Sequence, residues 1–169
     1  MGECASVIFE PLHEDFIVPS RQTEGSAGYD VCAYLKGRVV TIRRGASGQL
    51  EEVPITGQKL VLEPGDTALV PTGFKARVPT GYEAQVRIRS SMAFKRGLLL
   101  PNAPGTIDAD YPDEWLVMVK NDSSGAAEIG HGERIAQVVL NRVALLPWIE
   151  GEVGVWSDRL GGLGSTGES

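Results

Sequence analysis

The sequence has few cysteines and histidines, no long apolar segment and no excess of positive charge. Cys4 and Cys32 are too few for a disulfide framework, and with His13 and His131 far apart they make no Cys/His metal set, so we expect small reduced packing residues. A net charge of −6 argues against the basic face of nucleic-acid-coating or membrane-surface proteins. No apolar run approaches the roughly 20 residues of a membrane span. The N-terminus lacks a signal-peptide layout, so we expect a cytoplasmic protein.

The chain instead contains many glycines and prolines between short β-prone segments. Its 169 residues suit a single domain with a proper core. Short strands with Gly/Pro punctuation predict an all-β barrel or sandwich. The pattern predicts one short helix, Ser90–Arg96, ended by Gly97. The expected strands are Val7–Phe9, Tyr29–Tyr34, Val39–Ile42, Lys59–Leu62, Thr67–Pro71, Tyr82–Ile88, Trp115–Val119 and Ile135–Leu146.

Two segments stand apart from this pattern. Residues 35–58 contain RVVTIRR, a Gly/Ser turn and QLEEVPI, which indicates a protruding hairpin. It is either a surface loop without function or a partner-binding element. The segment 159–169 is rich in glycine and cannot pack into a core, so we expect a single β domain over 1–158 and a mobile tail. Because the tail carries Ser165 and Thr166, its backbone N–H groups and hydroxyls could also wrap phosphates.

The segment PGTIDADYPDEWLVMVKN, residues 104–121, contains the strongest catalytic signal. In an extended chain Asp108 and Asp110 share one face and Tyr111 points the other way, whereas a bend lets carboxylate and ring converge. The apolar run WLVMV suits the return strand of a hairpin. A carboxylate at the tip of that hairpin is placed to act as a general base on water. The alternative is that both aspartates merely form a turn.

Three other places carry polar groups suited to anions or cations. Arg89 followed by Ser90 and Ser91 at a helix start is a ready anion site, or else an ordinary N-cap with a solvated arginine. Asp30 lies in an apolar strand and must be paired, so it is either structural or aimed at a cation. Gln137 is the polar exception in the last strand, as a structural amide or a ligand contact.

Five segments in this order resemble the dUTP diphosphatase (dUTPase) family. They are AGYDVCA (27–33), RSSMAFKRGL (89–98), NAPGTIDADY (102–111), GERIAQ (132–137) and GGLGSTG (161–167). The resemblance implies a jelly-roll, or β-clip, subunit that forms a homotrimer, with active sites built from all three subunits. It also implies that 159–169 is a lid that closes a neighbour's site. The implied reaction converts dUTP and water to dUMP and diphosphate, with Mg²⁺ carried on the triphosphate.

The resemblance also assigns roles to residues. Asp108 matches the general base, and Tyr111 matches the ring under the deoxyribose that excludes ribonucleotides. Asp30 matches a carboxylate that reaches Mg²⁺ through water. The uracil-reading positions are Asn102, Gly105, Thr106, Ile107 and Leu116; the phosphate-binding positions are Arg89, Ser90, Ser91 and Gln137; and the tail positions are Arg159, Leu163, Gly164, Ser165 and Thr166.

The chain departs from the family pattern in several places. Ser91 stands where the family has glycine, and Pro112–Asp113 replaces a basic residue and glycine. Leu163 replaces the phenylalanine that stacks on uracil. Asp158 occupies the tail arginine position, with Arg159 beside it. The 35–58 insert is longer than the family norm.

Two other functions compete. The sister family, dCTP deaminase, needs a catalytic glutamate where this chain has Met118, and a Gly-Trp pair where it has Asp110-Tyr111. A dUTPase-like binding or regulatory protein with weak turnover is the second, although a pure binder has no use for Asp108. An all-β structural module without a nucleotide site is a weaker third.

Overall fold

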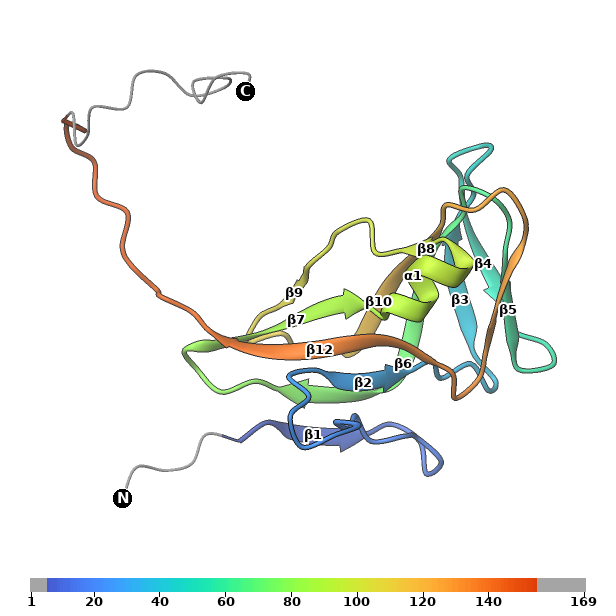
Figure 1. Ribbon diagram of the computed structural model, residues 1–169, viewed down its shortest axis with the longest axis horizontal. Helices are drawn as coiled ribbons and strands as arrows, with labels where there is room; N and C mark the ends of the chain where they lie inside the picture. The colour runs from blue at the N-terminus through green and yellow to red at the C-terminus, as the bar shows by residue number, and fades with distance from the viewer. Residues whose placement is uncertain (1–5, 155–169) are drawn as a thin grey trace.

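The computed structural model describes residues 6–154 (Figure 1). Residues 1–5 and 155–169, with the predicted domain boundary and tail, lie outside the described residues. The mostly β architecture with one short helix is confirmed. The elements are β1 (Ile8–Pro11), β2 (Tyr29–Cys32), β3 (Val39–Arg43), β4 (Leu50–Pro54), β5 (Lys59–Leu62), β6 (Thr67–Arg77), β7 (Tyr82–Ile88), α1 (Ser90–Arg96), β8 (Leu98–Leu99), β9 (Gly105–Ile107), β10 (Glu114–Asn121), β11 (Ala127–Gly130) and β12 (Arg134–Arg142).

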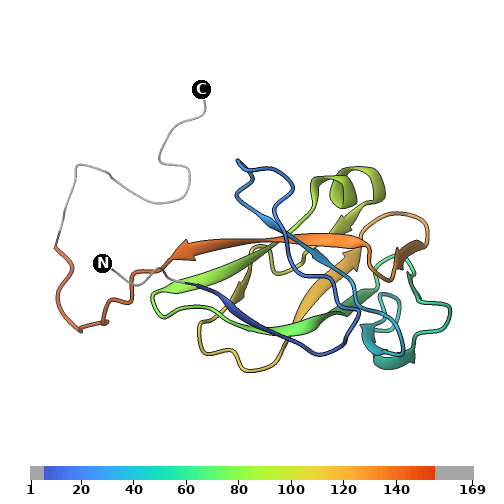
Figure 2. The ribbon, with the colours of Figure 1, turned by 90° about the horizontal axis from the view of Figure 1, so that it is seen from below.

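The strands form three sheets. A six-stranded sheet has the order β4-β3-β6-β10-β8, with β1 also pairing β6. A four-stranded sheet has the order β2-β12-β7-β9, and β11 pairs β5 in a small third sheet. The two views in Figures 1 and 2 show the segment after β12 leaving the body of the protein as an extended arm. Within residues 6–154, no helix has the length and apolarity needed to cross a membrane.

The observed strands differ from the sequence pattern at two ends. The strand predicted to end at Pro71 continues to Arg77, because β1 pairs with its second half. The last strand ends at Arg142 rather than Leu146, since Arg142 lies opposite Tyr82, the first residue of β7, and the pairing closes with a backbone hydrogen bond from the Val143 N–H to the Gly81 carbonyl at 3.0 Å. The pattern does not predict β8, β9 and β11, which have two, three and four residues and are too short to show a period.

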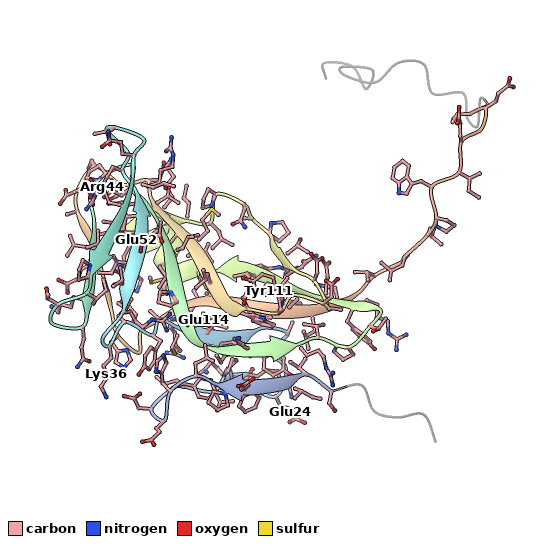
Figure 3. The ribbon with its side chains drawn as sticks, turned by 180° about the vertical axis from the view of Figure 1, so that it is seen from behind. Glu24, Lys36, Arg44, Glu52, Tyr111 and Glu114 are labelled. Atoms are coloured by element: carbon pink, nitrogen blue, oxygen red, sulfur yellow. The ribbon has the colours of Figure 1, made fainter. Side chains whose placement is uncertain are left out.

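Residues 35–58 contain the antiparallel pair β3 and β4, with Val39 opposite Pro54 and Arg43 opposite Leu50. Arg44 and Glu52, labelled in Figure 3, lie on this hairpin. The carboxylate of Asp66, which is 2% exposed, holds the far end of the hairpin to the body. It accepts hydrogen bonds from Arg44 Nη1 and from the Gly45 N–H, both at 2.8 Å.

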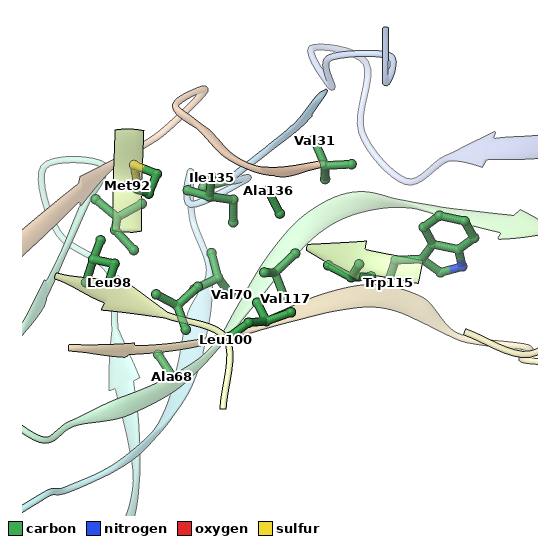
Figure 4. Close-up of a cluster of buried hydrophobic side chains, with 14 of the residues drawn as sticks. Val31, Ala68, Val70, Met92, Leu98, Leu100, Trp115, Val117, Ile135 and Ala136 are labelled. Carbon is green, nitrogen blue, oxygen red and sulfur yellow. The ribbon is translucent and has the colours of Figure 1, made fainter. Parts of the chain in front are cut away.

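The core lies between the two larger sheets. In Figure 4, Val31 and Ala136 of the four-stranded sheet approach Val70 and Val117 of the six-stranded sheet. Strand β10 contributes to this core through alternating side chains: Trp115, Val117 and Val119 point into the core, and the residues between them point outward. Further buried residues include Leu35, Ile42, Leu60, Leu62, Phe74, Leu98, Ile129 and Ile135.

We expect Asp66→Asn to lower the free energy of unfolding by about 2–4 kcal/mol at pH 7, because it leaves buried donors without a charged acceptor. Burial raises the pKa of Asp66, but hydrogen bonds from the Gly45 N–H, Arg44 and the Glu63 N–H outweigh it, so the folded pKa lies below the ordinary value. The stabilisation is therefore present above the unfolded pKa and is lost as the pH falls through the folded pKa.

Urea unfolding of both proteins at fixed concentration, at pH 7 and below pH 4, measures this effect. The gap between wild type and Asp66→Asn should narrow in acid. Glu51→Gln is the matched control, since Glu51 binds the same arginine at 2.8 Å but is half-exposed. Glu51→Gln should lower the free energy of unfolding by less than about 1 kcal/mol. If the difference in unfolding free energy between wild type and Asp66→Asn were equal at both pH values, the stabilising role of the ionised Asp66 carboxylate would be contradicted.

Candidate functional site

The residues predicted to bind phosphate and cation meet around one buried carboxylate. In the four-stranded sheet Gln137 lies opposite Asp30 on one side and opposite Arg87 on the other. Asp30 is 7% exposed, and its two oxygens are shared between two arginines. Arg89 Nε lies 3.4 Å from Oδ1, and Arg134 Nη1 donates to Oδ2 at 3.1 Å. This double pairing satisfies the carboxylate and holds Arg89 in place.

Arg89 is also the N-cap residue of α1, in an extended conformation and with no side-chain capping bond. Its Nη1 donates to the Arg134 carbonyl at 3.2 Å, which ties the helix start to β12. Ser90 and Ser91, the first two helical residues, are exposed. Their backbone N–H groups have no partner within the helix, because the first-turn donors of any helix lack one. The turn therefore offers donors and a fixed cation to an anion.

Gly28 lies in this group for a steric reason. A Cβ at this position would come within 2.5 Å of Gln137 Oε1 and 3.0 Å of Gln137 Cβ. Any larger residue at position 28 would therefore displace the amide of Gln137 from its place beside Asp30.

The predicted uracil-reading residues lie on and before β9. Gly105, Thr106 and Ile107 pair with β7. Asn102 lies close to Gly105, since a Cβ atom added to Gly105 would lie 3.2 Å from Asn102 Nδ2. Among the described strands β9 pairs only with β7, so its other edge carries unpaired backbone groups. Leu116 is half-exposed on the outer face of β10.

The acidic segment after β9 is a tight turn rather than an extended strand. The Tyr111 N–H donates to the Asp108 carbonyl at 3.2 Å, which brings the two residues to the ends of one turn. Within residues 6–154 the exposed carboxylate of Asp108 has no hydrogen bond or ion pair. A turn-forming aspartate usually accepts a backbone N–H two or three residues ahead, and Asp108 does not. The carboxylate is thus open to solvent.

The predicted hairpin around this turn is wrong in its pairing. Strand β9 belongs to the four-stranded sheet and β10 to the six-stranded sheet, so residues 108–113 join two sheets. The physical reason is that both strands already have partners, β7 for β9 and β6 for β10, with the buried core between them.

Asp108 and Arg89 lie far apart within one chain. Ile107 is opposite Ala84, whereas Arg89 follows the other end of β7. From Ala84 to Arg89 the chain advances by five residues, which is about 17 Å in a strand. Because β9 runs antiparallel to β7, Asp108 lies beyond Ile107 in the direction away from Arg89. Figure 1 shows α1 beyond the arrowhead of β7 and β9 alongside the body of that strand. One chain therefore does not bring the predicted base to the predicted phosphate turn.

The chain matches a family model and several named relatives over most of its length. A model of the dCTP deaminase-like family matches residues 5–143. The deoxyuridine 5'-triphosphate nucleotidohydrolase of Desulfotalea psychrophila is 42% identical over 155 residues, covering 91% of this chain and 89% of that protein. The chain belongs to the dUTPase family. The corresponding enzyme of Methylocella silvestris is 37% identical and covers 93% of this chain and 87% of that protein.

Solved dUTPases share this fold. The Streptococcus mutans dUTPase has a TM-score of 0.62 and 26% identity, and covers 83% of this chain and 98% of that protein. The Staphylococcus bacteriophage 80alpha dUTPase, a G164S mutant with dUpNHpp, has a TM-score of 0.75 and 22% identity, and covers 96% of this chain and 98% of that protein. The second likeness concerns the fold alone.

Sequence reasoning missed two side chains beside the candidate site. Arg134, a partner of Asp30, lies within GERIAQ, and the need of a buried carboxylate for a cation was the available signal. Glu114 begins β10 and contacts Arg38 from the start of the insert, at a separation in sequence that no local pattern reveals. The predicted tail residues Arg159, Leu163, Gly164, Ser165 and Thr166 lie outside the described residues.

Proposed function

We propose that this protein hydrolyses dUTP to dUMP and diphosphate, which removes dUTP from the nucleotide pool and supplies dUMP for thymidylate synthesis. The observation that carries the proposal is the exposed Asp108 carboxylate, without a protein partner in residues 6–154, on the same turn as Tyr111. Family membership and the relatives named as deoxyuridine 5'-triphosphate nucleotidohydrolases support it.

In the proposed reaction Asp108 accepts a proton from water as the water oxygen bonds to the α-phosphorus. The bond from that phosphorus to the bridging oxygen breaks, and diphosphate leaves with the electron pair. The phosphates are held by Arg89, the turn at Ser90 and Ser91, and Gln137. Positioning and charge neutralisation supply most of the rate in phosphoryl chemistry, so a single base suffices.

The nucleoside end of the site follows from the turn and the strands beside it. Tyr111 packs under the deoxyribose and leaves no room for a 2′-hydroxyl. Asn102, Gly105, Thr106, Ile107 and Leu116 read uracil, largely through main-chain groups. The unpaired edge of β9 supports this assignment, since a free backbone edge presents the alternating donors and acceptors that a base edge requires.

Mg²⁺ fits this site as a companion of the triphosphate. Residues 6–154 contain no group of three or more His, Cys, Asp or Glu residues able to hold a metal ion by themselves. Asp30 is already paired with two arginines, which suits contact with the ion through water rather than direct ligation. A bound Mg²⁺ would neutralise phosphate charge in the transition state. The phage phi11 dUTPase, 20% identical, coordinates a structural Mg(II) ion.

The functional unit in this proposal is a homotrimer with shared sites. The distance between Asp108 and Arg89 in one chain supports it, because a second chain must then supply the phosphate turn. The arm after β12 also supports it, since such an apolar segment needs a surface to cover it. Its exposed apolar residues are Leu145, Leu146, Trp148, Ile149 and Val153.

Trp115 marks a place where a second copy could bind. Its buried Nε1 has no acceptor among the described residues. The ring lines an apolar pocket of about 390 Å³ with Val18, Phe74 and Leu140. Buried donors are normally paired, so a backbone carbonyl from a partner's arm would satisfy both the pocket and the donor. The tail beyond 158 would then act as a lid on a neighbouring site.

Product analysis with dUTP, dCTP and UTP, with and without Mg²⁺, tests the function. We expect diphosphate and dUMP from dUTP with Mg²⁺, far slower turnover of UTP, and no deamination of dCTP. Deamination is disfavoured because Met118, on β10, cannot transfer a proton. Release of ammonia from dCTP would establish the sister activity, and tight dUTP binding without diphosphate would establish a binding protein.

A further inference from the structure

A partly buried ion pair joins the insert to the turn that carries Tyr111. Arg38, just before β3, donates from Nη1 and Nη2 to the two carboxylate oxygens of Glu114 at 3.1 and 2.5 Å. The two side chains are only 22% and 14% exposed. A forked pair of this kind fixes both side chains in one geometry. Arg38 Nη1 also lies 3.2 Å from His13 Nε2, whose ring stacks on Tyr34, so the guanidinium is held on several sides.

Glu114 also hydrogen-bonds to two other segments, strand β6 and the turn that carries Tyr111. Its Oε1 accepts the backbone N–H of Gly73 at 2.7 Å, which ties it to β6. Its carbonyl accepts the Tyr111 hydroxyl at 3.3 Å. Tyr111 is 38% exposed, and this bond and its turn restrain where the ring lies.

The strand pairing is irregular at this point. Glu114 is opposite Lys75 and Leu116 opposite Pro71, so β6 carries extra residues across from Trp115. Side chains make bonds where the ladder is disrupted: Thr72 Oγ1 donates to the Trp115 carbonyl at 2.7 Å, and Glu114 accepts from Gly73. Bulges of this kind often lie beside active sites and aim a side chain. Here the irregularity begins at Glu114, whose carbonyl accepts the Tyr111 hydroxyl.

The insert also forms a wall beside the tyrosine. Arg38, Val39 and Thr41 line the same pocket of about 300 Å³ as Tyr111 and Leu116. Tyr111 also lines a second pocket, of about 340 Å³, together with Asp110. A ring that borders open space can shift when its restraint is removed.

We propose that Arg38 is a positioning residue that acts through Glu114 on Tyr111 and thereby sets discrimination between deoxyribonucleotides and ribonucleotides. This rests on the proposed function and deepens it. Arg38 does not touch the substrate. It holds Glu114, which holds the Tyr111 hydroxyl, and the fixed ring denies space to a 2′-hydroxyl. The insert 35–58 thereby gains a role in specificity.

Arg38→Met, which keeps most of the unbranched stem of the side chain and removes its donors, tests the proposal in the full chain. We expect the ratio of kcat/KM for dUTP to that for UTP to fall about tenfold or more, chiefly through KM, with kcat for dUTP close to wild type. Asp108 and Arg89 are untouched by the change, so the chemical step should persist. Arg38→Lys keeps the positive charge but cannot donate to both Glu114 oxygens in the same planar geometry. Its dUTP to UTP ratio of kcat/KM should lie between those of wild type and Arg38→Met.

Arg44→Met is the matched control. Arg44 lies at the far end of the same hairpin (Figure 3) and makes comparable ion pairs with Glu51 and Asp66, both at 2.8 Å, but has no link to Tyr111. It should lower thermal stability and leave the dUTP to UTP ratio unchanged. Equal changes of the ratio in Arg38→Met and Arg44→Met would overturn the proposal.

A double-mutant cycle with Tyr111→Phe keeps the proposal testable even if Arg38→Met is unstable, because Arg38→Lys can replace it in the cycle. If Arg38 acts through the tyrosine hydroxyl, its substitution should change the ratio much less in the Tyr111→Phe protein. Additive effects would refute the route through Tyr111. A wild type that releases no diphosphate from dUTP defeats the proposed function itself, whereas an active wild type with an unaltered Arg38→Met ratio defeats only this inference.

Discussion

Turnover of dUTP is expected to fall about 10³-fold in Asp108→Asn, because the amide cannot accept the proton of the attacking water. Asparagine has nearly the size and shape of aspartate. The carboxylate makes no bond within residues 6–154 that the change could break, so neither fold nor substrate binding should suffer. The loss should therefore appear in kcat, with the affinity for a non-hydrolysable dUTP analogue close to that of wild type.

Single-turnover kinetics and calorimetric binding measure the two quantities separately. Asp110→Asn is the matched control, since Asp110 is exposed on the same turn and differs only in position. It should retain most of the turnover. If Asp108→Asn remains active and Asp110→Asn does not, the base is Asp110.

Two inactive variants should restore activity when they assemble together. Asp108→Asn chains keep Arg89, and Arg89→Met chains keep Asp108. A trimer that contains both kinds of chain, as tandem purification selects, would place an intact Asp108 opposite an intact Arg89 in roughly one of its three sites, whichever chain is in excess. The expected result is recovery from near zero to that fraction of wild-type activity. Asp30 retains Arg134 in the Arg89→Met chain, so we expect that chain to fold.

Co-expression with two different affinity tags, followed by tandem purification and a diphosphate assay, measures this recovery. A mixture of Asp108→Asn and Asp108→Ala chains is the control, because no site in it can contain the base. The shared-site proposal is refuted if the first mixture is as inactive as the control, since the two residues would then serve a site within one chain.

Local patterns predict local structure well in this protein. The helix at Ser90–Arg96, closed by Gly97 with a positive φ, is confirmed at both ends. Strands Tyr82–Ile88 and Lys59–Leu62 agree with the structure because turn residues bound them on both sides. The sequence pattern also singles out Asp30 as a carboxylate needing a partner, and the structure supplies Arg89 and Arg134.

Contacts between distant segments escaped prediction because they depend on strand pairing. Hydrophobic alternation does not reveal that β9 and β10 belong to different sheets, since each strand shows only its own inward face. The Arg38–Glu114 pair joins the insert to the strand that follows the Asp108–Tyr111 turn, and both residues look like ordinary surface charges in the sequence.

The amino-acid sequence by itself determined the β class, the short helix, the family and the chemical types of residue at the site, because turn residues, alternation and ordered motifs are all local in the chain. Only the tertiary structure decided which of those residues meet. Asp30 meets Arg89, Arg134 and Gln137 through strand register, while Asp108 lies at the far end of β7 from Arg89. Register is set by the joint burial of two sheet faces, and no single segment contains that information.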